Sequence, residues 1–397
     1  MALSRWGRES VGVVLTLAGL GALASGAWAK DNPGEELLKA AKKGETDKVK
    51  ALIAQGADVN VRNKDQRTPL IEAARAEKGP ALRALMDAHA NLDAQDKDGN
   101  TALQEAAKKD NPQLALDLIA AGADVNLKDK DGWTALMEAG THGTSAVAHE
   151  LIKKGADVNA QTKDGRSPLS AAASKGSLSL VDELIAAKAA VKDPAIGGFA
   201  LLVAAGEGHD DILKRLIEAK APITYVGPDG VTPLMAAAAK GQENTVQTLI
   251  RSGLQPNAQD GKGRTALMLA AEKGENRTVD ALLSSGAAVD LADNDGWTAL
   301  FHAANGTSYP GDTIATLVRY GAGIDRQAGY RGKTALMIAA ENGREGAVEA
   351  LLKAGAGRAI KSGEGKTAGD YAIQKKNAKI CDLLGVAMPA KDQAVKK

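Results

Sequence analysis

The chain repeats itself with a period of about 33 residues, and this period restricts the possible folds more than any other feature of the sequence. The triplet Thr-Pro-Leu or Thr-Ala-Leu begins at Thr68, Thr101, Thr134, Thr232, Thr265, Thr298 and Thr334. Degenerate copies begin at Ser167 and Thr367. A unit this short cannot bury an apolar face alone, so neighbouring units are expected to share one continuous core.

Two departures from the period are expected to change the curvature of the array. The step from Ser167 to Thr232 is one residue shorter than two periods, and the intervening unit begins at Phe199 instead of Thr. The step from Thr298 to Thr334 is three residues longer than one period. Three blocks are therefore expected, over residues 35–192, 199–325 and 333–384.

Each unit is predicted to form two short helices joined to the next unit by a projecting turn. A pair of small residues such as Ala106-Ala107 allows the first helix to pack closely on its neighbour. A glycine such as Gly176 then favours the left-handed end of that helix. The second helix ends near an apolar pair such as Leu118-Ile119. The hydroxyl of each triplet Thr or Ser is predicted to cap the N-terminus of the first helix.

The unit over residues 98–130, "DGNTALQEAAKKDNPQLALDLIAAGADVNLKDK", resembles the ankyrin repeat, and the resemblance runs from about Glu35 to Leu384. It implies an all-α repeat solenoid in which about ten helix-turn-helix units, with β-hairpin fingers between them, stack into one curved array. The solenoid is predicted to occupy residues 35–388. Its units are predicted to start near residues 35, 68, 101, 134, 167, 199, 232, 265, 298, 334 and 367.

Residues 1–29 are predicted to form a signal peptide that is cleaved after Ala29. Arg5 and Arg8 precede an apolar run over residues 11–24, which is short for a membrane span of about 20 residues. Residues 30–34 form a short polar lead-in, and residues 389–397 a tail expected to be flexible. These features indicate a bacterial protein exported to the periplasm. The alternative is an uncleaved leader that anchors the chain in the inner membrane.

Composition argues against several classes of function. Removing a leader with two basic residues and one acidic residue leaves 48 of each, so the mature chain is neutral and unlike a general nucleic-acid binder. One cysteine, Cys381, permits neither an intramolecular disulfide nor a four-ligand zinc site. The histidines show no metal-ligand spacing and are expected at the surface or at the ends of loops, and the repeated methionines are expected to pack in the core. No catalytic residue, metal, cofactor or small-molecule substrate is predicted.

The resemblance implies that a partner would contact the fingers and the inner helices. Many of these positions carry basic residues, which predicts a groove that steers a partner with an acidic surface. The alternative is that these side chains serve solubility. The basic residues assigned to partner binding are Arg67, Lys108, Lys109, Arg166, Lys175, Lys240, Arg264, Lys273 and Lys333.

Two tryptophans share one position of the repeat, immediately before the triplet Thr. Trp133 lies in "DKDGWTAL" and Trp297 in "DNDGWTAL", five units apart. Tryptophan is enriched among interface hot spots, so both are predicted to contact a partner. In the alternative interpretation each indole covers a neighbouring finger.

The predicted function is therefore that of an exported, monomeric ankyrin-repeat scaffold that binds another protein through its concave groove and fingers. One alternative is a membrane-anchored structural tether of the cell envelope, which requires the uncleaved leader. The other is a metal carrier or an enzyme, for which no motif of the chain provides support.

Overall fold

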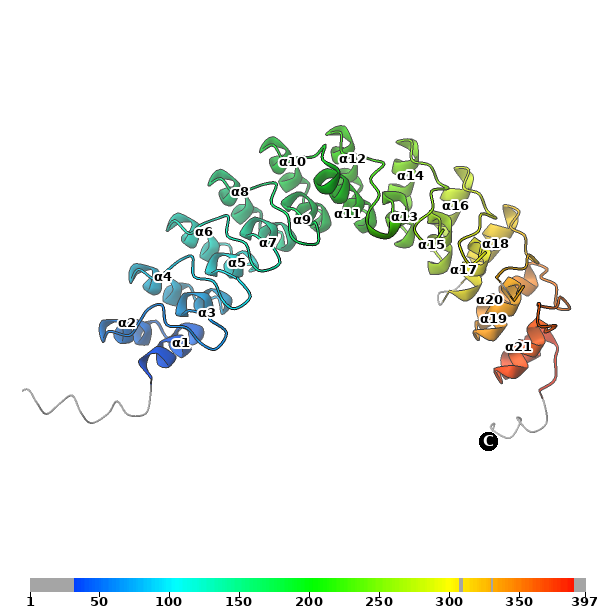
Figure 1. Ribbon diagram of the computed structural model, residues 1–397, viewed down its shortest axis with the longest axis horizontal. Coiled ribbons are helices and arrows are strands. Elements are labelled where there is room, and N and C mark those ends of the chain that lie inside the picture. Colours follow the sequence, from blue (N-terminus) through cyan, green and yellow to red (C-terminus); the bar gives the residue numbers. More distant parts are fainter. Residues whose placement is uncertain (1–31, 307–309, 330, 389–397) are drawn as a thin grey trace, which may run out of the picture.

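A computed structural model describes residues 32–306, 310–329 and 331–388 of the chain. Within these ranges 22 α-helices form eleven antiparallel pairs, stacked side by side in an arc (Figure 1). The first helix of each pair lies on the concave side, the second lies on the convex side, and helices α1 and α21 lie at opposite ends of the arc (Figure 1). The predicted all-α solenoid is confirmed, whereas the leader and the tail lie outside the described residues.

The inner helices are α1 Pro33–Lys43, α3 Pro69–Arg75, α5 Ala102–Ala107, α7 Ala135–His142, α9 Pro168–Lys175, α11 Phe199–Glu207, α13 Pro233–Ala239, α15 Ala266–Lys273, α17 Ala299–Asn305, α19 Ala335–Glu341 and α21 Ala368–Gln374. The outer helices are α2 Thr46–Ala54, α4 Gly79–Asp87, α6 Gln113–Ala120, α8 Ser145–Lys153, α10 Leu178–Ala186, α12 Asp210–Glu218, α14 Glu243–Arg251, α16 Asn276–Ser284, α18 Gly311–Arg319, α20 Glu345–Lys353 and α22 Ala378–Leu384. Two further short helices, η1 Pro194–Gly198 and η2 Pro228–Gly230, precede α11 and α13.

The triplet hydroxyls cap the inner helices as predicted, with one exception. The Thr134 side chain, for example, accepts a hydrogen bond from the backbone N–H of Met137. Thr298 makes no such bond. Methionine sulfur is a further acceptor, which the sequence did not predict. The backbone N–H of Thr334 donates to the sulfur of Met337 at 3.4 Å. The backbone N–H of Thr265 donates in the same way to the sulfur of Met268.

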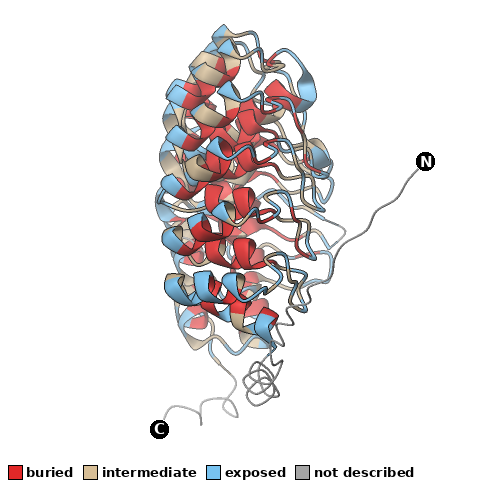
Figure 2. Cartoon of the chain, turned by 90° about the vertical axis from the view of Figure 1, so that its left-hand side faces the viewer, coloured by how far each residue is buried: buried red, intermediate tan, exposed pale blue. Residues whose placement is uncertain are grey.

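The core is a continuous stripe between the inner and outer helices, and it runs the length of the array (Figure 2). The small residues that follow each triplet are fully buried, because an inner helix can approach its neighbour closely only where side chains are short. Met137, Met235, Met268 and Met337 are also buried there, which confirms their predicted role in packing. Cys381 is buried as well.

The fingers between units are tight turns held by a side-chain acceptor, and the described residues contain a single isolated β-bridge, between Ala328 and Lys333. Asp260 shows the arrangement: its Oδ1 accepts the backbone N–H groups of Lys262 and Arg264 at 2.9 and 2.8 Å. The same register position holds Asn63, Asp96, Asp129, Thr162, Asp293 and Ser362. A polar acceptor at this position therefore fixes the shape of the finger.

Neighbouring fingers are linked by backbone hydrogen bonds, such as Lys130 N–H to the Asp98 carbonyl at 2.9 Å. A second ladder joins the loops after the outer helices, as where Asn126 Oδ1 accepts the N–H of Asp157 at 2.7 Å. Both ladders are interrupted near η1. Lys192 and Thr224, which occupy the register of Asn126 in their units, form no equivalent bond within the described residues.

The unit that begins at Phe199 differs from the others in local structure, whereas the change of curvature expected there stays a prediction. The residues before it form a π-helical turn, η1, that runs directly into α11. Asp193 caps this turn by accepting the N–H of Ala195 at 2.8 Å. The outer helices on either side, α10 and α12, pack less closely than any other consecutive outer pair that the structure describes. The junction is therefore loosened on its outer side only, because the inner helices α9 and α11 remain among the most closely packed pairs.

Protonation of the finger carboxylates is expected to make the fold less stable in acid. Burial alone would raise the pKa of Asp260, but the backbone N–H and guanidinium of Arg264 and the backbone N–H of Lys262 outweigh it and hold that pKa below its usual value. A carboxylate with a depressed folded-state pKa stabilises the fold above its unfolded pKa of about 3.9, and this contribution is lost as the pH falls through the folded-state value. We therefore expect the free energy of unfolding to decrease when the pH is lowered below about 4.

Variants at this position test the assignment. Asp260→Asn keeps an oxygen acceptor, as Asn63 does in its own finger, but removes the titrating group. We expect it to flatten the acid dependence, whereas Asp260→Ala should also cost about 1–3 kcal/mol at neutral pH because two N–H groups lose their acceptor. Urea unfolding between pH 3 and pH 7 measures both effects. If Asp260→Asn leaves the acid dependence of stability unchanged, other groups cause that dependence.

Candidate functional site

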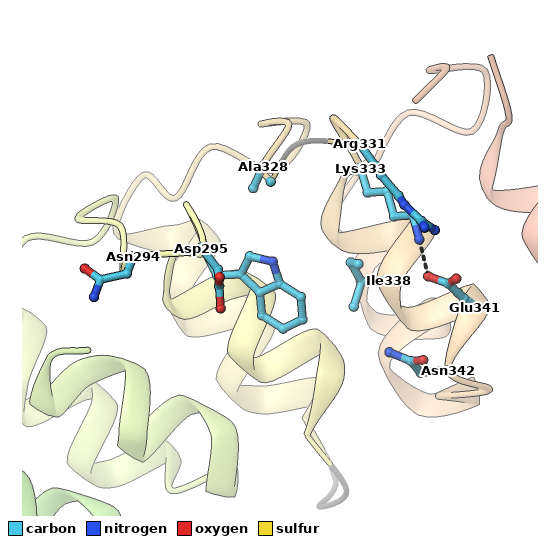
Figure 3. Close-up of a pocket in the computed structure, with 10 residues that line it drawn as sticks. Asn294, Asp295, Ala328, Arg331, Lys333, Ile338, Glu341 and Asn342 are labelled. Carbon is cyan, nitrogen blue, oxygen red and sulfur yellow. Dashed lines mark hydrogen bonds and ion pairs between the residues drawn. The ribbon is translucent and has the colours of Figure 1, made fainter. Parts of the chain in front are cut away.

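A pocket of about 570 Å³ opens on the concave side between the finger before α17 and helix α19. Trp297 and Ala328 contribute from the fingers and Ile338 from α19, and these form its apolar surface. Lys333 and Glu341 form an ion pair at one wall, with Asn342 next to it (Figure 3). The pocket thus combines an apolar floor with a polar rim, the arrangement typical of binding sites.

Trp297 is half-buried and is held from several sides. Its backbone N–H donates to Oδ1 of Asp293 at 2.9 Å, while Oδ2 of the same carboxylate lies 2.8 Å from Nε2 of His302. The indole centroid lies 6.0 Å from that of Phe301 and 5.6 Å, edge to face, from that of His302. The prediction that each histidine lies at the surface or at the end of a loop is wrong for His302, which lies within α17 and is buried against this carboxylate.

A second pocket, of about 200 Å³, lies against Trp133. The guanidinium of Arg166 sits over the indole, 5.7 Å from the ring centroid, and Phe199 and Val203 of α11 form the opposite wall. The backbone N–H of Trp133 donates to Asp129 at 2.8 Å. Both tryptophans are therefore fixed at the backbone before any partner binds.

The two pockets are equivalent positions of the repeat. Each has Trp before the Thr of one unit and a basic residue, Arg166 or Lys333, before the Ser or Thr of the next unit. Each is also lined by the fourth residue after that Ser or Thr, which is Ala171 in one pocket and Ile338 in the other. The sequence showed the shared tryptophan position but not that the following unit completes a pocket around it.

The predicted basic residues lie on the fingers and inner helices, but most of their charges are already paired. The ammonium nitrogen of Lys108 lies 3.2 Å from a carboxylate oxygen of Glu105 and 3.5 Å from one of Glu138. Burial would lower the pKa of Lys108, but the carboxylates of Glu138 and Glu105 outweigh it and raise that pKa. Burial dominates at Glu138 and raises its pKa despite Lys108. The groove is therefore a mosaic of ion pairs rather than a uniformly basic stripe.

The other predicted cations show the same pairing. The pairs are Arg67 with Asp65 and Asp96, Lys109 with Glu77, Arg166 with Asp164, Lys240 with Glu207, Arg264 with Asp260, Lys273 with Glu272 and Lys333 with Glu341. Lys175 is the one of the nine for which the described residues show no ion pair. Contact of these residues with a partner stays a prediction.

The described residues show no cluster of metal ligands, no membrane-spanning helix and no activated thiol. They contain no group of three His, Cys, Asp or Glu side chains arranged to hold a metal ion. In the same part of the chain, no helix combines the length and the hydropathy that crossing a bilayer requires. Burial raises the pKa of Cys381, which disfavours its reactive thiolate.

Comparison with known proteins identifies the family. A family model described as "Ankyrin repeats (3 copies)" matches residues 37–129, 105–195, 169–260, 252–328 and 307–392. No curated protein matches the chain. Ankyrin repeats generally act as scaffolds for protein–protein interaction and are typically non-catalytic. Because the matches together span residues 37–392, the chain belongs to the ankyrin-repeat family.

Proposed function

We propose that the chain is an exported, non-catalytic, monomeric scaffold that binds a partner protein through its concave face and fingers. The observation that carries this proposal is the pair of equivalent indole pockets, around Trp133 and Trp297, on that face. Aromatic side chains held rigidly in the free protein contribute strongly to binding, because little conformational entropy is lost when the partner docks. The proposal includes neither nucleic acid nor a small-molecule substrate.

Charge has a secondary part in this proposal. The sequence predicted a partner with an acidic surface, but an acidic group would compete with carboxylates that already pair with Lys108, Lys240 and Lys333. Lys175 supports some attraction of an acidic surface, since its charge is not paired within the described residues. We therefore assign affinity mainly to the pockets, and orientation and rate of association to the surrounding charges.

Replacing the tryptophans tests the proposal. In crosslinked pull-downs from periplasmic extract, quantified by mass spectrometry, we expect Trp133→Ala and Trp297→Ala each to weaken capture of the same protein. A loss of about 2 kcal/mol, roughly 30-fold in affinity, is typical of a hot-spot aromatic. Tyr320→Ala is the matched control, because Tyr320 is an exposed aromatic residue at the end of the outer helix α18. A double tryptophan variant that captures as much partner as the original chain would contradict the proposal.

Export is tested separately at the N-terminus, since residues 1–31 lie outside the described part of the chain. We expect protein recovered from the periplasm to begin at Lys30, because small residues at Ala27 and Ala29 suit a signal peptidase. Intact-mass measurement and N-terminal sequencing give the result directly. Recovery of the whole leader in the membrane fraction would support the anchored tether instead.

A further inference from the structure

The two indole pockets are copies of one binding element, and their walls indicate what they bind. We propose that they hold two uncharged, apolar side chains from a single polypeptide segment of the partner. This inference rests on the proposed function, which assigns partner binding to the concave face. It adds the chemistry of the contacts and their spacing along the partner.

The apolar surfaces of the two pockets favour an apolar side chain. The indole of Trp297 shares its pocket with Ile338, and that of Trp133 shares its pocket with Phe199 and Val203. An apolar group placed on these surfaces removes apolar area of both molecules from water, which favours binding. Because the backbone of each tryptophan is already bonded to an aspartate, the surfaces are present before binding.

The charged rims disfavour a charged side chain. Glu341 is engaged by Lys333 at one pocket, while Arg166 is engaged by Asp164 and Glu207 by Lys240 at the other. An acidic group entering either pocket would have to displace one of the paired carboxylates, and Asp295 would also repel it at the Trp297 pocket. A basic group could pair with Asp295 there, but the one carboxylate at the Trp133 pocket, Glu207, is already paired. An uncharged side chain meets neither cost.

The size of the Trp133 pocket favours a side chain over a small molecule. Small-molecule sites usually enclose about 300–1,000 Å³. The Trp133 pocket, at about 200 Å³, is below that range and suits a single side chain. The Trp297 pocket, at about 570 Å³, has room for a side chain together with its adjoining backbone. One polypeptide that places one anchor residue in each pocket therefore fits both pockets best.

The repeat sets the spacing of the anchors. The tryptophans are five units apart, and at about 10 Å per unit they are separated by roughly 50 Å along the arc. An extended polypeptide advances about 3.3 Å per residue, so its anchors would be about 15 residues apart. Two linked contacts should then bind far more tightly than one, because the second forms at a high effective concentration.

Peptides with rigid spacers test this geometry on the full chain. The probes are acetylated, amidated peptides in which two Phe residues flank 8, 12, 16 or 20 prolines. Polyproline extends about 3.1 Å per residue, so 16 prolines reach roughly 50 Å. Binding is followed by ¹⁹F NMR of chain labelled with 5-fluorotryptophan, with Trp133→Phe and Trp297→Phe variants to identify the resonances of these two among the four tryptophans. Matched control peptides replace one Phe by Ala or both Phe residues by Asp.

We expect both resonances to shift with the two-Phe peptides and neither to shift with the Asp peptide. Affinity should peak at one spacer length and there exceed that of the one-Phe peptide at least tenfold. Trp297→Ala should lower the affinity for the best two-Phe peptide to the affinity for the one-Phe peptide. Affinity that does not depend on spacer length would overturn the two-anchor proposal, as would stronger shifts with the Asp peptide.

The outcome is distinguishable from failure of the proposed function. If the tryptophan variants lose the natural partner while the two-Phe peptides show no advantage, the scaffold function stands and the anchor chemistry is wrong. If the variants keep the natural partner, the concave indoles are not its binding site, whatever the peptides do.

Discussion

Gly197→Ala is expected to destabilise the units that meet at η1 by about 3 kcal/mol or more, at the upper end of the cost of overpacking. A Cβ added at Gly197 would overlap the backbone carbonyl oxygen of Val191, which is not the flexible end of a side chain and cannot move aside alone. Relief would require the π-helical turn to open. Hydrogen exchange with mass spectrometry should show faster exchange in α10, α11 and α12, while the terminal units remain protected.

Gly206→Ala in α11, the helix that directly follows η1, is the matched control. A Cβ there meets the Cβ of Ala236 at 3.6 Å, an ordinary contact. Ala is favoured over Gly in a helix interior by about 1 kcal/mol, so this variant should be neutral or slightly more stable. If Gly197→Ala unfolds at the same urea concentration as Gly206→Ala, the turn does not pack as described.

Phe301→Ala is expected to cost about 3–5 kcal/mol, because it removes a large side chain from the fully buried seam between inner helices. It should also disturb Trp297, whose ring lies against Phe301. Urea unfolding would show the loss of stability, and quenching of tryptophan emission would show increased access to the indole.

Phe301→Met is the conservative variant, since Met137, Met235, Met268 and Met337 fill the same slot in other units. A hydrophobic exchange that keeps most of the volume usually costs less than about 1.5 kcal/mol. Equal destabilisation by Ala and Met would mean that shape at this slot, and not filled volume, determines stability.

The sequence predicted most of the fold because the period carries it. Small residues at one register position and a hydroxyl at another place eleven helix pairs side by side, and Thr298 is the one triplet residue that fails to cap within the described part of the chain. The short unit at Phe199 was also predicted to differ. The π-helical form of η1 was not, because it depends on how Asp193 and the close approach of Gly197 to Val191 are accommodated in three dimensions.

The candidate site was predicted less completely. The position of each tryptophan was visible in the repeat, but the pocket depends on residues about one unit further along, such as Arg166 and Ile338. The ion pairs were missed for the same reason. Lys240 and Glu207 lie one full period apart in the chain, but their charged atoms are 2.9 Å apart in the fold. A comparison of positions separated by one period would have found that pair.

The interruption of both ladders at η1 has a mechanical consequence. In such a stack each unit is stabilised mainly by its two neighbours. A boundary between a folded and an unfolded segment therefore costs the free energy of the one interface that it exposes. That energy is lowest where fewest bonds cross. A chain whose ends are pulled apart should therefore open first on its convex side, between α10 and α12, while the inner helices α9 and α11 stay in contact.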